Sequence, residues 1–191
     1  MKSLEQHIED EAGHLARAKR DRYYRGYILN RTWLAINFLQ TAYWLPENPK
    51  ILEVGIGDGS NLRRIVKETP KIKLGNCTGT CLQLLPEHEQ LRAEGLTIVD
   101  KTLIEELPTS WDGEYHLVMA SLVLSWADNL EKSIERLSKV TAQNGYLLCF
   151  DVPKTIRKLI ALTTDNFIEQ EPRLSYIEDY LGIVLLKQRK T

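Results

Sequence analysis

The sequence has no excess of charge of either sign. Its 25 lysines and arginines are matched by 26 aspartates and glutamates, which leaves a formal net charge of −1 over 191 residues. Acidic and basic residues are interspersed, so the chain has no general electrostatic reason to bind nucleic acid or an anionic membrane. The composition therefore favours a small-molecule substrate and predicts neither a nucleic-acid nor a membrane partner.

Long apolar runs, cysteine frameworks and repeats are also missing. No signal peptide and no apolar run of bilayer-spanning length is visible, which predicts a cytoplasmic protein. The three cysteines are an odd number without a framework spacing, so reduced thiols are expected. Cys77 and Cys81 lie four residues apart with no matching histidine or cysteine group, and no metal site is predicted. Without repeats or linker composition, the length predicts one domain with a sizeable core.

What the sequence does contain is a glycine-rich turn within residues 51–60. Ile51, Leu52 and Val54 form the short apolar run of a buried parallel strand. Alternate glycines then let the backbone turn sharply. An amphipathic helix follows, so its free N–H groups and positive dipole end face the turn. This order of elements predicts a nucleotide-sized pocket at the carboxyl end of a strand.

The spacing of these glycines separates two kinds of nucleotide site. A dinucleotide fingerprint, G-x-G-x-x-G, would place its third glycine at Ser60. The chain has G-x-G-x-G instead, preceded by an acid, and so resembles motif I of the class I S-adenosylmethionine-dependent methyltransferases, (D/E)-x-G-x-G-x-G. The resemblance implies S-adenosyl-L-methionine as cofactor, with the acid at its methionine end and the turn against its methionine and ribose. The implied contact residues are Glu53, Gly55, Ile56, Gly57, Asp58 and Gly59.

Residues 71–81 are expected to contain the second strand, although glycine, asparagine and threonine dilute its apolar content. The segment C-T-G-T-C-L-Q resembles the family's V-T-G-V-D-I-S, which places Cys81 where an acid usually accepts both ribose hydroxyls. Because a thiol is a weak donor and a weak acceptor, this change could cost about 1.5–3 kcal/mol, or roughly ten- to hundred-fold in affinity. Either the cofactor binds more weakly, another group reaches the ribose, or the protein has lost catalysis.

The third strand is expected at residues 96–99. Family members often have an acid shortly after this strand that bonds the adenine amino group. The end of the strand favours Asp100 for this position, whereas counting back from Leu107 and Pro108, which resemble the family's L-P, favours Leu103. Both alternatives stay open.

Residues 115–126 carry a second resemblance. Their sequence, Y-H-L-V-M-A-S-L-V-L-S-W, is similar to motif IV, F-D-L-V-x-S-x-x-L-x-W, whose strand ends beside the transferred methyl group. Ser121 and Leu122 would border the cofactor, and Trp126 would either wall the substrate pocket or fill the core. His116 replaces the family's aspartate. A general base is conceivable there because histidine titrates near neutrality, but a place near the start of the strand favours a structural role.

Residues 1–45 carry no family motif and are expected to be helical. Apolar residues at three- and four-residue spacing predict an amphipathic helix over 3–22, which either lies over the sheet edge as a lid or packs as a surface helix. A second helix is predicted over 28–44. Tyr24, in the link between them, is a substrate-pocket candidate. A basic cluster either is a solvated helix end or meets an RNA or protein substrate: Lys19, Arg20, Arg22 and Arg25.

The fold predicted for the whole chain is α/β and doubly wound, with a Rossmann-like, largely parallel seven-stranded sheet over residues 46–191 and N-terminal helices over 1–45 as a lid or cap. The remaining predicted elements are helices over 86–95, 129–142 and 154–162, a strand over 146–150 entered by a turn at Asn144-Gly145, and an antiparallel pair of strands over 167–171 and 182–187.

The function implied by the resemblance is methyl transfer from S-adenosylmethionine to a nitrogen, oxygen or carbon nucleophile of a small molecule. Alignment of the reacting groups supplies much of the acceleration in such a displacement, and no convincing base is visible, so the catalytic residues are unassigned. Two alternatives stay open. One is a non-catalytic or partner-dependent methyltransferase-like binding protein, and the other is an enzyme of this fold that catalyses a rearrangement or cyclisation.

Overall fold

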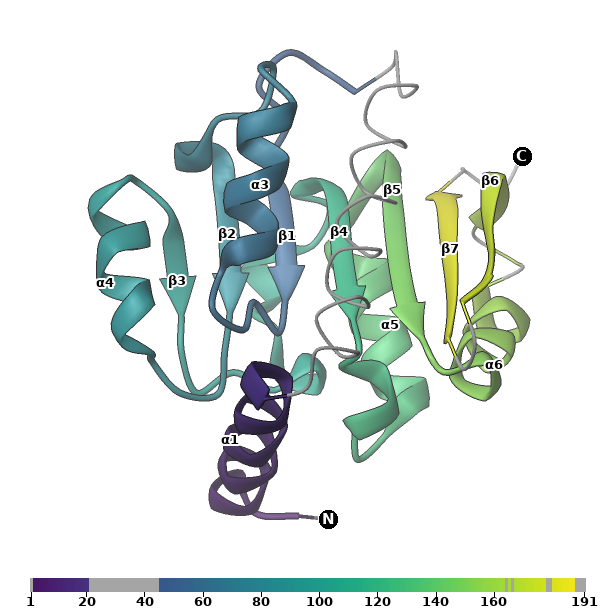
Figure 1. The fold of residues 1–191 in the computed structure, drawn as a ribbon. Coiled ribbons are helices and arrows are strands. Elements are labelled where there is room, and N and C mark those ends of the chain that lie inside the picture. Colours follow the sequence, from purple (N-terminus) through teal and green to yellow (C-terminus); the bar gives the residue numbers. More distant parts are fainter. Residues whose placement is uncertain (1, 21–44, 164, 166, 178–179, 188–191) are drawn as a thin grey trace.

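The computed structural model describes residues 2–20, 45–163, 165, 167–177 and 180–187. In this part of the chain, seven strands form one sheet in the order β3-β2-β1-β4-β5-β7-β6 (Figure 1). The strands are β1 (Ile51–Val54), β2 (Cys77–Thr80), β3 (Thr97–Val99), β4 (Tyr115–Ser121), β5 (Thr141–Asp151), β6 (Phe167–Ile177) and β7 (Tyr180–Lys187). The α-helices are α1 (Leu4–Arg20), α3 (Ser60–Glu68), α4 (Pro86–Ala93), α5 (Leu130–Val140) and α6 (Pro153–Thr163).

The pairing of the strands confirms a doubly wound sheet. Strands β1 to β5 pair in parallel, whereas β7 pairs antiparallel with both β5 and β6. The strand order reverses between β1 and β4. In open α/β sheets the crevice beyond the carboxyl ends at such a reversal is where ligands bind.

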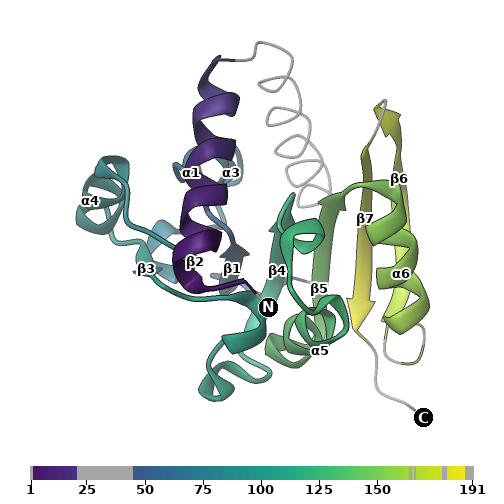
Figure 2. The ribbon, with the colours of Figure 1, turned by 90° about the horizontal axis from the view of Figure 1, so that it is seen from below.

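Helices cover both faces of the sheet, and β1 is buried between them. Its side chains alternate between the two layers, as a strand requires. Ile51 packs in the core cluster that includes Leu62 and Ile65 of α3, while Leu52 and Val54 pack in the cluster that includes residues of α5 and α6. Figure 2 shows α3 on one side of the sheet and α5 and α6 on the other. Glu53 has the parity of Ile51, so its side chain faces the α3 layer.

The start of β5 differs from the prediction by five residues, because β5 begins at Thr141 rather than at Tyr146. The turn expected at Asn144-Gly145 is part of β5, which begins at Thr141, and α5 ends at Val140. Asn144 adopts φ 61°, and the pairing with β4 shifts between Tyr115 and Leu117. The local turn signal is therefore absorbed as an irregularity within the strand, because the neighbouring strand supplies backbone partners on both sides of it.

Helix α1 lies across the carboxyl edge of the sheet. It sits beyond the arrowheads of β1 and β2 in Figure 1 and crosses in front of them in Figure 2. Whether α1 acts as a lid or only packs as a surface helix stays a prediction. None of the helices in the described ranges is long and apolar enough to cross a membrane. The helix predicted over 28–44 lies outside the described residues.

Candidate functional site

The three glycines of the turn after β1 adopt left-handed conformations. Gly55, Gly57 and Gly59 have φ values of 70°, 59° and 75°, which favour residues without a Cβ. The turn is tied to β2 because the Ile56 N–H donates to the Thr80 carbonyl at 2.9 Å. Asp58 accepts the Ser60 N–H at 3.0 Å, and this bond directs the chain into α3.

Packing within the protein also requires two of these glycines. A Cβ built on Gly55 would meet Val123 Cγ1 at 2.2 Å, and a Cβ on Gly59 would meet Leu91 Cδ1 at 2.1 Å. The turn is thus pressed against the segment that follows β4 on one side and against α4 on the other. These contacts bring the ends of β1 and β4 together at the point where the strand order reverses.

Glu53 and Asn61 form a buried pair under the turn. Glu53 is 0 % exposed and Asn61, the second residue of α3, is 2 % exposed. Asn61 Nδ2 donates to Glu53 Oε1 at 2.6 Å. Burial, with the charge of Glu53 as a second cause, raises the pKa of the Cys77 thiol to about 12. Sequence reasoning found Glu53 from the motif but missed Asn61, since nothing local indicates that it faces the acid.

The end of β2 is organised by an imidazole. His88 of α4 is fully buried, and its Nδ1 accepts the Leu85 N–H at 3.1 Å. Nε2 therefore carries the proton and donates to the Gly57 carbonyl at 2.6 Å. The Cys81 sulfur lies 3.9 Å from Nδ1, and the residue is 3 % exposed. The predicted ribose position thus lies beside a histidine that sequence reasoning did not identify.

After β3 the structure keeps both candidate adenine positions near the carboxyl edge. Asp100 follows β3 directly, and its carbonyl accepts the Thr102 hydroxyl at 2.9 Å. Leu103 precedes the 3-10 helix η2 (Ile104–Glu106). Both are half-buried, so the choice between them stays a prediction.

The end of β4 contains a strained residue. Leu122 has φ 58°, a conformation uncommon for a bulky side chain. It is held there because its N–H donates to the Phe150 carbonyl at 2.7 Å. Asp151, fully buried at the end of β5, accepts the Ser125 N–H at 3.2 Å. Burial raises the pKa of Asp151. Ser121, just before Leu122, is 4 % exposed and lies at the same end of β4.

Asp151 was missed by sequence reasoning, although a signal exists. It directly follows the apolar run L-L-C-F at the end of a predicted strand. An acid in that place lies at the carboxyl edge, where polar side chains support loops. Here it accepts the Ser125 N–H in the turn after β4.

Of the two substrate-pocket candidates, Trp126 lies among the described residues and Tyr24 does not. Trp126 is 43 % exposed, so it does not fill the core, and the Lys2 ammonium lies 5.9 Å from its ring centroid. Tyr24 lies outside the described residues, as do Arg22 and Arg25 of the basic cluster.

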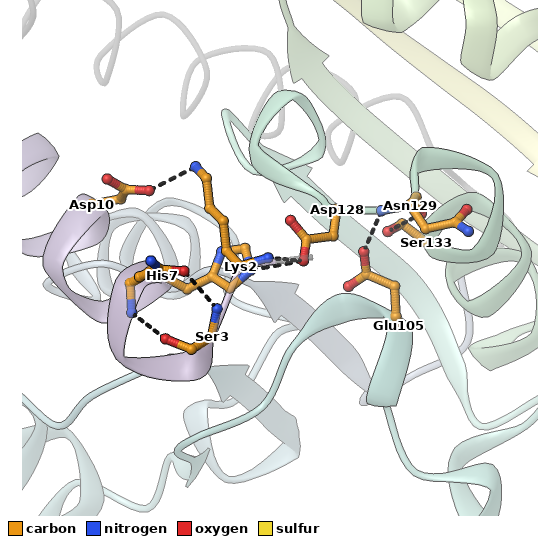
Figure 3. A network of polar contacts seen from close by, with 9 residues as sticks. Lys2, Ser3, His7, Asp10, Glu105, Asp128, Asn129 and Ser133 are labelled. Atoms are coloured by element: carbon orange, nitrogen blue, oxygen red, sulfur yellow. Dashed lines mark hydrogen bonds and ion pairs between the residues drawn. The ribbon is translucent and has the colours of Figure 1, made fainter.

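Helix α1 is anchored to the loop that follows Trp126, as Figure 3 shows. Asp128 accepts the Lys2 backbone N–H at 2.9 Å, and its second contact is His7 Nε2 at 3.4 Å. Burial alone would raise the pKa of Asp128, but these neighbours outweigh it and hold the pKa below its usual range. A reciprocal pair of bonds between Ser3 and Gln6 caps the start of the helix.

His116 has a structural position, as its place in the strand predicted. It lies near the amino end of β4, and its Nδ1 accepts the Lys50 N–H at 3.1 Å. Burial lowers its pKa. It is therefore remote from the carboxyl edge and supplies no base there.

The residues at this edge fit a nucleoside cofactor at the methionine end. Beside the left-handed turn is the buried carboxylate of Glu53, and Asn61 Oδ1 is buried without a hydrogen-bond partner among the described residues. A buried acceptor of this kind calls for a donor.

Comparison with known proteins agrees with this geometry. No family model matches the chain. The biotin biosynthesis bifunctional protein BioCD of Bordetella avium (strain 197N) is 29% identical over 105 residues, which are 54% of this chain and 22% of that protein. The chain therefore matches only about a fifth of the length of this curated relative.

Solved structures show the fold. The 1,6-didemethyltoxoflavin-N1-methyltransferase of Burkholderia thailandensis, with bound 1,6-didemethyltoxoflavin and S-adenosylhomocysteine, has a TM-score of 0.73 and 12% identity over 99% of this chain and 92% of that one. The N-methyltransferase NodS of Bradyrhizobium japonicum, in complex with S-adenosylhomocysteine, has a TM-score of 0.67 and 16% identity, over 98% of this chain and 100% of that one. The [4+2]-cyclase SpnF has a TM-score of 0.64 and 13% identity, over 82% of this chain and 80% of that one. The chain has the fold of the class I S-adenosylmethionine-dependent methyltransferases.

Proposed function

We propose that this chain transfers a methyl group from S-adenosyl-L-methionine to a small-molecule acceptor. The observation that carries the proposal is the buried Glu53 beside a turn of left-handed glycines at the carboxyl end of β1. Two neighbours of the same fold were solved with S-adenosylhomocysteine, which supports the same cofactor here.

Each part of the carboxyl edge has a role in this proposal. Bound S-adenosylmethionine supplies an electrophilic methyl group on a sulfonium. Glu53 holds the methionine end and the turn over residues 55–59 lies along the methionine and ribose. Cys81 lies beside the ribose, Asp100 or Leu103 beside the adenine, and Ser121 and Leu122 border the reacting region. The chain's main catalytic contribution is alignment and exclusion of water.

Helix α1 closes this edge in the proposal. The helix is anchored at Asp128, which follows the motif IV segment in the sequence. Polar contacts therefore connect the helix to the loop after β4. Residues 1–45 then act as a cap on a cofactor-binding core over 46–191. Tyr24 and Trp126 are the candidates for the acceptor pocket. The acceptor atom is nitrogen, or an oxygen or carbon acidic enough to react without a strong base.

Two further proposals concern surroundings and partners. The cysteines Cys77, Cys81 and Cys149 are buried and in no disulfide, which supports a reducing, cytoplasmic location. The balanced charge supports a small-molecule acceptor rather than nucleic acid.

A second candidate is catalysis of a rearrangement or cyclisation on the same cofactor-bound scaffold. The likeness to the cyclase SpnF favours it over other non-transfer reactions. The substitution at Cys81 favours a third candidate, a methyltransferase-like subunit without activity of its own.

Calorimetric titration with S-adenosylmethionine and S-adenosylhomocysteine tests the cofactor. Binding at micromolar ligand supports the proposal, and no heat at millimolar ligand contradicts it. A panel of small amines, phenols and activated carbon acids is then read by product mass. A gain of one methyl group supports transfer, an isomer supports rearrangement, and an unchanged panel with bound cofactor favours the non-catalytic subunit.

A further inference from the structure

Asn61 is a buried polar residue that the methyltransferase motif does not account for. Asparagine is a poor helix former because its side chain competes with the backbone. Nevertheless it occupies the second position of α3. There it is buried together with Leu62, whereas Ser60 and Arg63 on either side of this pair are exposed. Its amide faces Glu53 rather than capping the helix, since Nδ2 donates to Oε1 at 2.6 Å. The hydrogen bond to Glu53, rather than helix propensity or capping, is therefore what distinguishes an asparagine at this position.

The rest of the Asn61 amide points to a ligand. Its Oδ1 is buried, and among the described residues it has no hydrogen-bond donor. Leaving such an acceptor unpaired is unfavourable. An ammonium group has three donors and no acceptor, so it can satisfy an amide oxygen and a carboxylate together. The thioether and adenosine parts of the cofactor have no cationic donor of this kind.

We propose that Asn61 is a positioning residue which orients Glu53 and, with it, selects ligands that carry an α-ammonium group. This inference rests on the proposed function, because it concerns the methionine end of the same cofactor site. It adds a specificity: the site distinguishes S-adenosylhomocysteine from 5′-methylthioadenosine, which is also an uncharged thioether at sulfur but lacks the amino-acid portion.

The test is calorimetry of the full chain with these two thioethers. Asn61→Leu removes the amide at similar volume, and Asn61→Asp keeps the shape but replaces the donor by an acceptor facing Glu53. Asn61→Leu should weaken S-adenosylhomocysteine binding by about tenfold or more, whereas Asn61→Asp, whose carboxylate can still accept from the ammonium group, should weaken it less. Neither should change the affinity for 5′-methylthioadenosine, which also shows that the variants are folded.

Thr69→Val is the matched control. Thr69 directly follows the last residue of the same helix, is 5 % exposed, and its hydroxyl has no hydrogen-bond partner among the described residues. It lies at the opposite end of α3 from the turn, so both affinities should stay at the wild-type values. Equal losses for both ligands in the Asn61 variants would overturn the inference and assign Asn61 a purely structural role.

A double-mutant cycle covers the case in which an Asn61 variant folds poorly. If Asn61 acts through Glu53, Asn61→Ser should lower S-adenosylhomocysteine affinity less in the Glu53→Gln background than in the wild type. Additive losses would refute the coupling. If the wild type binds neither ligand, the proposed function itself fails, and that outcome is distinct from a wild type that binds both while the Asn61 variants do not discriminate.

Discussion

Gly55→Ala tests whether the protein's own packing requires the first glycine of the turn. At φ 70° an L-residue is in the left-handed region, which costs about 1–2 kcal/mol. The new Cβ would meet Val123 Cγ1 at 2.2 Å and Val123 Cβ at 3.4 Å, and overpacking of this kind costs about 1–3 kcal/mol. We therefore expect the free energy of unfolding to fall by about 2–5 kcal/mol.

The assay is thermal and denaturant unfolding followed by circular dichroism. For a chain of this length each kcal/mol lowers Tm by about 2–4 °C, so the expected drop is roughly 4–20 °C. Gly113→Ala is the matched control, because Gly113 has φ 74° but no atom within 4 Å of its added Cβ. Gly113→Ala should therefore lower the stability only by the cost of placing an L-residue in the left-handed region. Val123→Ala should recover the packing part of the loss in the Gly55→Ala background. Equal losses at Gly55 and Gly113 would refute the packing argument.

The other predictions concern cofactor binding, the pH dependence of stability and the anchoring of α1. Gly57→Val should abolish S-adenosylmethionine binding in calorimetry, because φ 59° strains valine and its side chain blocks approach to the turn; normal affinity would mean that the pocket lies elsewhere. Burial lowers the pKa of His116, so below about pH 6.5 the unfolded chain takes up the proton first and stability falls. His116→Asn should flatten that part of the curve of Tm against pH, and an unchanged slope would contradict this. Asp128→Ala should speed amide hydrogen exchange in the first turn of α1, whereas Asp10→Asn, which breaks an exposed ion pair, should not; equal rates would show that Asp128 does not anchor the helix.

The glycine turn could be predicted from the sequence because its causes are local. Strand, turn and helix follow each other within ten residues, and each has its own signature: a buried apolar run, glycines in the left-handed region, and helical spacing. The strand that ends at Ser121 could also be predicted from its local sequence, because it too contains a buried apolar run. Sheet order and the antiparallel pair at the edge followed from the family resemblance rather than from any local pattern.

The supporting residues of the site could not be predicted in this way. Asn61 and His88 read as ordinary polar residues on helices, and their roles depend on which residue of another element faces them. The turn at Asn144 shows the opposite failure. Its local signal was strong, yet pairing with β4 absorbed it into β5, since backbone hydrogen bonds along a neighbouring strand outweigh the preference of a dipeptide.

The missing acid at Cys81 and the buried His88 are best understood together. His88 has one lone pair in its neutral form, at Nδ1, and the Leu85 N–H already occupies it. A carboxylate at position 81 would place two further acceptors near that atom, to which the neutral imidazole has no N–H to donate. A thiol avoids this conflict, and the His88 bond to the Gly57 carbonyl is preserved. The chain thus fixes the loop after β2 through the imidazole of His88. Cys81→Asp should accordingly lower Tm, and it tightens S-adenosylmethionine binding only if the ribose lies at this position; a fall in affinity would assign the ribose to another residue.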